Sequence, residues 1–174
     1  SDNGGHKASN NGAWRGMKGD LYEGGIRVPF IARWPGRIEP GAVSDERGHS
    51  NDILPTICTA AGIELPKTGT FDGDSILPLL EGGALDRADE PEFWYFDKNL
   101  GRKKKKKGTL TGAVRLGDWK LLTAYGEPKE LYNLKEDPKE SKNRLGEMPE
   151  KTVELSMLLA GWLSEPRNTY KTGK

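Results

Sequence analysis

A change in the spacing of apolar residues, near residues 82–92, constrains the fold of this chain more than any other feature. Before this segment, residues 52–62 carry apolar side chains at helical spacing. After it, apolar and polar residues alternate over 112–122, which is the period of a half-buried strand. The sequence therefore predicts two parts, an α/β part over residues 1–85 and an antiparallel-sheet part over residues 86–174.

The second part has the pattern of a small α+β module. A Gly-Asp pair at 117–118 lies between two alternating segments, so residues 112–122 predict a β-hairpin on a two-residue turn. Residues 93–96 and 130–134 predict further strands, and Pro149 opens a helix. That helix places large apolar side chains on one face: Leu155, Leu158, Leu159 and Trp162. We expect one helix to cover an antiparallel sheet.

The first part is less regular. Residues 1–25 are rich in Gly and Asn and predict a long loop, and loops of such length in compact proteins are usually functional. Residues 25–34 are β-branched and aromatic and predict a strand. In the helix over 52–62 we expect Asp52 to be the N-cap and Cys58 to be a small buried apolar residue.

Charge and composition exclude several classes of protein. The formal net charge is +1, so no global field marks the chain as a nucleic-acid binder. A single cysteine excludes an internal disulfide framework and a cysteine-rich zinc site. No stretch of the sequence comes near the length of about 20 consecutive apolar residues that is needed to cross a bilayer, so we expect no membrane span.

Asp2 and Asn3 are the candidate metal ligands. Their carboxylate and carboxamide are hard oxygen donors of the kind that Ca²⁺ and Mg²⁺ prefer, and the glycines that follow permit a sharp turn. Two donors cannot complete a six- to eight-coordinate site. By itself, a segment of this kind is far more often a simple turn.

Lys18 is the candidate ligand for an anion. It has glycine on both sides within residues 15–25, which lets the backbone approach a ligand closely, and lysine is a compact point charge for an oxyanion. Arg15 has a planar guanidinium group with several hydrogen-bond donors, and Glu23 is a possible ion-pair partner for Arg15 or Arg27. A glycine-rich surface loop with solvated charges is the alternative.

These segments, taken together with others downstream, resemble the type I, formylglycine-dependent sulfatase family of the alkaline-phosphatase-like superfamily. The matching strings run in order along nearly the whole chain: Asp2-Asn3-Gly4, residues 15–19, 22–29, 34–36, 52–56 with 61–62, 72–80, 117–120, and 130–134 through 137–143. The resemblance implies a partial alkaline-phosphatase-like sandwich followed by the small C-terminal α+β module. It also implies that the chain is the C-terminal part of a sulfatase and starts inside its metal-binding motif.

The family assigns roles to three residues of this sequence. Asp2 and Asn3 correspond to two ligands of a catalytic Ca²⁺, and Lys18 corresponds to the lysine that contacts the sulfate group. The family nucleophile, a formylglycine made in a Cys/Ser-x-Pro-x-Arg motif, has no counterpart here, because Cys58 is followed by Thr-Ala-Ala. We therefore expect the nucleophile and the remaining metal ligands upstream of Ser1, and the chain alone to be inactive.

Other charged residues have less definite roles. His6 could face substrate or make local hydrogen bonds, His49 is expected to be structural, and Arg27 is expected to pair with Glu23. The basic run over 102–107 could capture a sulfated polysaccharide or form a solvated loop.

The expected substrate is a sulfated small molecule or a sulfated polysaccharide. By resemblance, the compartment is periplasmic, secreted or lysosomal. A phosphatase or phosphonate hydrolase on the same scaffold, or a non-catalytic calcium- or glycan-binding remnant, remain the alternatives.

Overall fold

The computed structural model describes residues 1–67, 70–87, 89–98 and 108–165. The chain divides into two compact units, which are described separately. The first unit comprises Ser1 with residues 3–28 and 88–174, and the second comprises Asp2 with residues 29–87. The first 28 residues therefore group largely with the C-terminal sheet. The domain boundary that the sequence predicts at residue 85 refers to the complete enzyme, and it remains a prediction.

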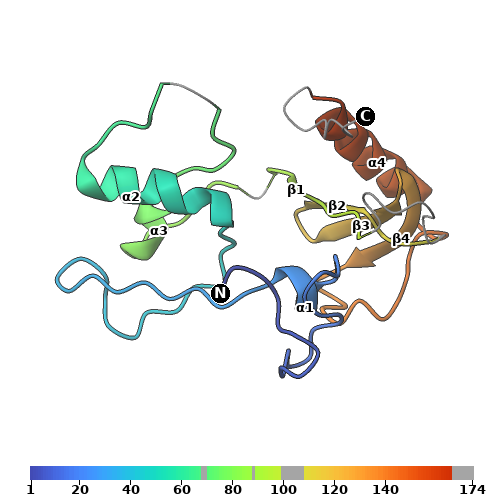
Figure 1. The fold of residues 1–174 in the computed structure, drawn as a ribbon, viewed down its shortest axis with the longest axis horizontal. Helices are drawn as coiled ribbons and strands as arrows, with labels where there is room; N and C mark the ends of the chain where they lie inside the picture. The colour runs from blue at the N-terminus through green and yellow to red at the C-terminus, as the bar shows by residue number, and fades with distance from the viewer. Residues whose placement is uncertain (68–69, 88, 99–107, 166–174) are drawn as a thin grey trace. The chain divides into compact units, whose positions relative to one another are not determined.

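A four-stranded antiparallel sheet forms the centre of the first unit, with the strands in chain order (Figure 1). The strands are β1 (Glu92–Tyr95), β2 (Gly112–Leu116), β3 (Trp119–Ala124) and β4 (Glu127–Asn133). Leu116 pairs with Trp119 across the predicted two-residue turn, whose Gly117 has a φ of 56°. Such turns require positive φ, and glycine adopts it without strain. The predicted hairpin is confirmed.

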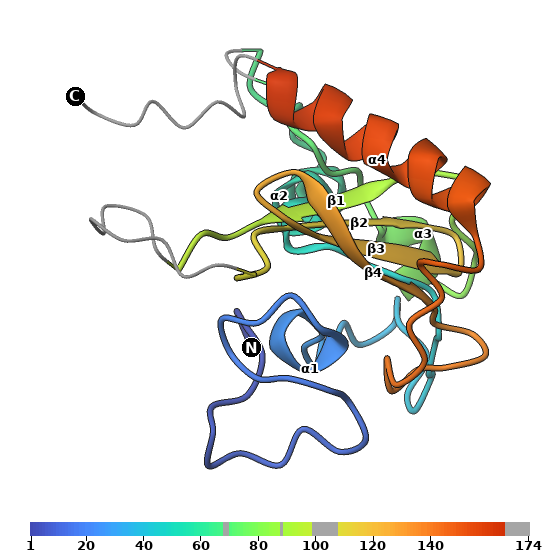
Figure 2. The same ribbon diagram turned by 90° about the vertical axis from the view of Figure 1, so that its right-hand side faces the viewer.

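Helix α4 (Pro149–Ser164) covers one face of this sheet, as the sequence predicts (Figure 2). The side chains that meet there are apolar and almost fully buried: Val114, Leu121, Leu131, Leu155 and Leu159. Because successive strand residues point to opposite faces, the neighbours of these strand residues must face the other way. The expected module of an antiparallel sheet plus one helix is therefore confirmed.

The opposite face of the sheet is also covered, which the sequence does not predict. A second apolar cluster forms there from Leu21, Ala113, Leu122, Tyr132 and Leu134, with Tyr22 and Ile26 packed against it. Figure 2 shows α1 (Glu23–Ile26) on the side of the sheet away from α4. The N-terminal segment thus supplies the third layer of this unit.

The predicted strand over residues 25–34 is wrong. Residues 25 and 26 end helix α1, and residues 27–34 form no strand in the structure. A strand requires a neighbour with which to form ladder hydrogen bonds, and β propensity alone does not supply one. Phe30 and Ile31 are 58% and 91% exposed, so this segment has no apolar cover within its unit.

The second unit contains the predicted helix as α2 (Ile53–Ala61), preceded by the short 3-10 helix η1 (Ser50–Asp52). Gly62 ends α2 with a φ of 68°, and α3 (Leu77–Leu80) is a single short helical turn. His49 caps the start of η1, because its side chain accepts a hydrogen bond from the Asn51 N–H at 3.2 Å. The structural role expected for His49 is confirmed.

Asp52 is the N-cap residue of α2, as the sequence predicts, but its side chain makes no capping hydrogen bond to that helix. Its carboxylate is buried and accepts hydrogen bonds from the backbone N–H groups of His49 and Asp74, at 2.7 and 3.0 Å. Arg87 donates to both of its oxygens, at 2.7 and 3.2 Å. Asp52 therefore joins three segments of the second unit.

The apolar stripe of α2 is not buried within this unit. Ile53, Leu54 and Ile57 are 45%, 45% and 59% exposed, and Cys58 is a half-buried free thiol rather than a core residue. Among the described residues, no helix is long and apolar enough to cross a bilayer. The basic run over 102–107 lies outside the described residues.

Candidate functional site

Three backbone hydrogen bonds tie the N-terminal segments of the first unit together. The Gly4 N–H donates to the Gly25 carbonyl at 3.0 Å, and the Gly24 N–H donates to the Arg15 carbonyl at 2.7 Å. The Lys18 N–H donates to the Gly5 carbonyl at 2.9 Å. The segment after Asp2 and Asn3 and the loop that carries Lys18 are therefore held side by side through their backbones.

Glycines make this close approach possible. A Cβ on Gly24 would lie 2.5 Å from the Gly16 carbonyl oxygen, and one on Gly25 would lie 2.6 Å from the Met17 carbonyl oxygen. Real Cβ atoms do not come that close to backbone atoms, so side chains at these positions would force the segments apart. The Gly-Gly pair at 24–25 thus fixes the distance between the loop and helix α1.

Lys18 lies in the middle of the loop formed by residues 15–23, called here the lysine loop. Its side chain is exposed, and Gly16 and Gly19 on either side both have a φ of 85°. Within the described part of the chain, the Lys18 ammonium makes no hydrogen bond or ion pair. It is therefore accessible to an anionic group, and its role as an anion ligand remains a prediction.

Asp2 and Asn3 occupy the start of the chain, where Asp2 is exposed and Asn3 is half-buried. The described residues contain no group of three His, Cys, Asp or Glu side chains that could hold a metal ion. A carboxylate and a carboxamide fit Ca²⁺ chemically, but they can supply only part of its coordination shell. Their role as calcium ligands remains a prediction.

His6 makes a local hydrogen bond. Its Nδ1 accepts from the Ala8 N–H at 3.5 Å, so it has the local contact that the loop interpretation predicts. Arg27 lies 3.9 Å from Glu23, as expected, and its guanidinium stacks on Trp14 at 4.3 Å.

A buried ion triad, Lys120 with Glu23 and Glu140, joins the end of the lysine loop to the sheet. The Lys120 side chain is 0% exposed, and its Nζ lies 2.8 Å from Glu23 Oε1 and 2.9 Å from Glu140 Oε1. The second Glu140 oxygen accepts the Glu23 backbone N–H at 2.7 Å. Burial raises the pKa of Glu140, although the neighbouring Lys120 opposes that shift.

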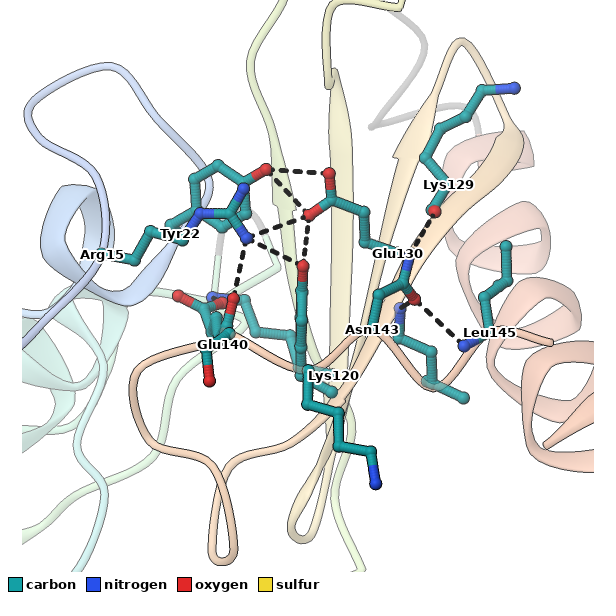
Figure 3. A network of polar contacts seen from close by, with 12 residues as sticks. Arg15, Tyr22, Lys120, Lys129, Glu130, Glu140, Asn143 and Leu145 are labelled. Atoms are coloured by element: carbon teal, nitrogen blue, oxygen red, sulfur yellow. Dashed lines mark hydrogen bonds and ion pairs between the residues drawn. The ribbon is translucent and has the colours of Figure 1, made fainter. Parts of the chain in front are cut away.

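A second polar cluster, called here the Glu130 cluster, consists of Glu130, Arg15, Tyr22 and Tyr132. Figure 3 labels the first three of these residues. The Tyr22 hydroxyl lies 3.0 and 2.8 Å from the two Glu130 oxygens, and the Tyr132 hydroxyl donates to Oε2 at 2.6 Å. Arg15 Nη1 donates to the Tyr132 hydroxyl at 2.8 Å and lies 3.5 Å from Glu130 Oε2. Burial, together with the Glu130 carboxylate, raises the pKa of both tyrosines, so both remain hydroxyl donors.

Sequence reasoning missed these residues for an identifiable reason. Lys120 and Leu122 share one face of β3, and Glu130 and Tyr132 share the same face of β4, because strand residues alternate. Polar residues on one face of a strand usually indicate a solvent face. Here that face is covered, so Lys120 is an ion-pair partner in the interior. Arg15 pairs with Glu130 and not with Glu23, which binds Lys120.

Comparisons with known proteins identify the family. The family model for the C-terminal region of N-sulphoglucosamine sulphohydrolase matches residues 16–165. A sulfatase of Formosa agariphila is 36% identical over an alignment of 187 residues. This alignment covers 99% of this chain and 33% of that protein.

Solved structures share the fold. Ps i-CgsB in complex with k-i-k-neocarrahexaose has a TM-score of 0.79 at 24% identity, over 100% of this chain and 38% of that chain. A protein from a study of glycosaminoglycan metabolism by Bacteroides thetaiotaomicron has a TM-score of 0.63 at 26% identity, over 88% of this chain and 32% of that chain. The chain spans about a third of the length of these relatives. The family match, with an antiparallel sheet under one helix, shows that this chain belongs to the sulfatase family, where it corresponds to the C-terminal region.

Proposed function

We propose that the complete enzyme hydrolyses sulfate esters and that this chain supplies the lysine that contacts the sulfate group. The observation that carries the proposal is the bond from the Lys18 N–H to the Gly5 carbonyl at 2.9 Å. It holds the backbone of the lysine loop beside the segment that follows Asp2 and Asn3, while the Lys18 side chain is exposed. An exposed ammonium suits a sulfate ester, whose oxygens carry the negative charge.

Each candidate residue has a defined task in this proposal. Lys18 binds a sulfate oxygen and stabilises the charge that develops on it, and its ammonium can donate a proton to the departing alkoxide. Asp2 and Asn3 hold part of a Ca²⁺ site. When bound, Ca²⁺ would add positive charge against the sulfate oxygens. A formylglycine nucleophile would come from another part of the enzyme.

The proposed substrate class is a sulfated carbohydrate. The support comes from the Bacteroides thetaiotaomicron protein, whose structure comes from a study of glycosaminoglycan metabolism. It is 26% identical to this chain. An aryl sulfate is the practical reporter substrate, because its hydrolysis releases a coloured phenol.

The test is Lys18→Ala in the complete enzyme, with Lys135→Ala as the matched control. Lys135 is an exposed lysine outside the loop. Loss of a group that stabilises the developing oxyanion should lower kcat by about 10²- to 10³-fold, whereas the control should keep wild-type kcat. Unchanged kcat in Lys18→Ala would refute the assignment.

Two further measurements separate the alternatives. Faster turnover of a phosphate monoester than of the matching sulfate ester would favour a phosphatase over a sulfatase. We expect residues 1–174 alone to show no sulfate-ester hydrolysis, because Lys18 and two metal ligands do not constitute a complete site. Turnover by the purified chain would contradict that expectation.

A further inference from the structure

We propose that the Glu130 cluster and the buried triad position the lysine loop, so that the C-terminal sheet determines where Lys18 meets the sulfate group. Glu130, Tyr132 and Lys120 are thus positioning residues for the reaction, although they lie on strands and make no contact with Lys18 in the structure. The inference rests on the proposed function of Lys18.

The contacts fall at the two ends of the lysine loop. Arg15 opens the loop and binds Tyr132 and the Glu140 carbonyl, at 2.8 and 2.7 Å. At the other end, Tyr22 binds Glu130 and the next residue, Glu23, binds Lys120. Every one of these partners belongs to β3, to β4 or to the segment after β4. The sheet therefore holds both ends of a loop whose centre is Lys18.

Glu130 is the residue on which the side chains of the Glu130 cluster converge. Its carboxylate receives two tyrosine hydroxyls and lies against the Arg15 guanidinium (Figure 3). The same guanidinium lies 3.9 Å above the Tyr22 ring, so Arg15 and Tyr22 are held against each other and against one acceptor. Hydrogen bonds to a charged acceptor are about twice as strong as neutral ones, and they are directional.

The buried triad holds the end of the loop through buried contacts. Glu140 has a φ of 53°, in the left-handed region that favours glycine, yet the sequence has a glutamate there. Its side chain is 0% exposed and bonds both to Lys120 and to the Glu23 backbone. A strained backbone that carries a fully satisfied buried carboxylate indicates that the contact outweighs the strain.

Lys18 itself is held only through its backbone in the described part of the chain. Its position relative to substrate consequently depends on the loop ends and on the glycine contacts. A displacement of about 1 Å at a reacting group can cost about 10²-fold in rate, even when its cause lies far from the chemistry. Loosening one end of the loop should therefore reduce the contribution of Lys18.

The experiment uses Glu130→Gln in the complete enzyme, with Glu127→Gln as the matched control. Glu127 lies on the same strand, is exposed and makes no contact with the cluster in the structure. We expect Glu130→Gln to lower kcat/KM for an aryl sulfate by about 10- to 10²-fold, and the control by less than about twofold. Tyr132→Phe, a smaller change, should lower it in the same direction, by about threefold to tenfold.

A double variant tells positioning from general destabilisation. If Glu130 acts through Lys18, then Glu130→Gln added to Lys18→Ala should change kcat/KM by less than about twofold. Independent structural damage would instead multiply the two losses. Equal effects in both backgrounds, or a Glu130→Gln variant as active as the Glu127→Gln control, would overturn the inference.

The result also distinguishes this inference from the proposed function. Wild-type activity in Lys18→Ala would remove the proposed function and the inference together. A large loss in Lys18→Ala beside unchanged activity in both Glu130→Gln and Tyr132→Phe would leave the function standing and remove only the inference. Thermal unfolding of each variant shows whether it is folded at the assay temperature, and Tyr132→Phe provides the test if Glu130→Gln is not.

Discussion

Replacement of Lys120 by methionine is the most informative perturbation of stability. Methionine keeps most of the volume of the side chain but removes the ammonium that lies between Glu23 and Glu140. Both carboxylates are buried, at 4% and 0% exposure, so neither can recover its lost partner from bulk water. The substitution therefore leaves the two buried carboxylates without the ammonium between them, and the nearest other cations among the described residues lie 3.9 and 4.0 Å from Glu23 only.

Two estimates of the cost agree. Removal of one partner from a buried ion pair typically destabilises a protein by about 3–5 kcal/mol. Counted as hydrogen bonds to charged groups, the contacts at 2.8 and 2.9 Å represent about 1.5–3 kcal/mol each, or about 3–6 kcal/mol together. Since whole domains have free energies of unfolding of about 5–15 kcal/mol, Lys120→Met should remove a large fraction of the stability.

The assay is urea unfolding of the chain followed by tryptophan fluorescence, since Trp119 on β3 and Trp162 on α4 both pack against the apolar cluster between the sheet and α4. Lys129→Met is the control, because Lys129 is exposed on the neighbouring strand β4. Surface substitutions of that kind usually change the free energy of unfolding by less than about 0.5 kcal/mol. A cost below about 1 kcal/mol for Lys120→Met would refute the buried triad as a source of stability.

The pH dependence of the variant gives a second check. Burial already raises the pKa of Glu140 against the effect of Lys120, and without Lys120 it should rise further. The folded variant then binds more protons than the unfolded chain between the ordinary glutamate pKa of about 4.3 and the raised value. Stability in that window falls as pH rises, so the cost of Lys120→Met should be smaller near about pH 5 than near about pH 8.

Two other outcomes are expected. Gly24→Ala should destabilise the first unit by about 1–3 kcal/mol or more, because its Cβ would lie 2.5 Å from the Gly16 carbonyl oxygen. Gly146→Ala is the control and should have little effect, because the space around Gly146 is open. Equal melting temperatures of the two variants would contradict this prediction. For Asp52, burial raises the pKa, but the hydrogen bonds from Arg87 and two backbone N–H groups outweigh it and the pKa is lowered. The stability that Asp52 contributes is therefore present above the ordinary aspartate pKa of about 3.9 and lost as pH falls below it, and Asp52→Asn should flatten that part of an acid-unfolding curve followed by circular dichroism.

Local patterns predicted the elements of the C-terminal part because each depends on residues close together in sequence. The hairpin needs a two-residue turn with positive φ, and the Gly-Asp pair at 117–118 provides it. The long helix needs Pro149 at its start and a regular apolar face, and both are visible in the sequence. The strand over 25–34 failed because strand formation depends on a partner, which local propensity does not reveal.

The lysine loop shows most clearly where sequence reasoning stops. The spacing of glycines around Lys18 indicated a loop that can approach an anion, and the resemblance to sulfatases gave Lys18 its role. What holds that loop was not visible, because Glu23 and Lys120 are 97 residues apart and Glu23 and Glu140 are 117 apart. No periodic signal connects residues at such separations.

The sequence by itself therefore determined the sulfatase family, the hairpin, the covering helix and the candidate ligands Asp2, Asn3 and Lys18. Only the tertiary structure decided that the polar face of the sheet is an interior surface. The physical reason is that Lys120 and Glu130 have the same alternating pattern whether water or the N-terminal segment covers them. Which of the two covers them depends on the packing of Leu21 and Tyr22 against that face, and this packing exists only once the chain has folded.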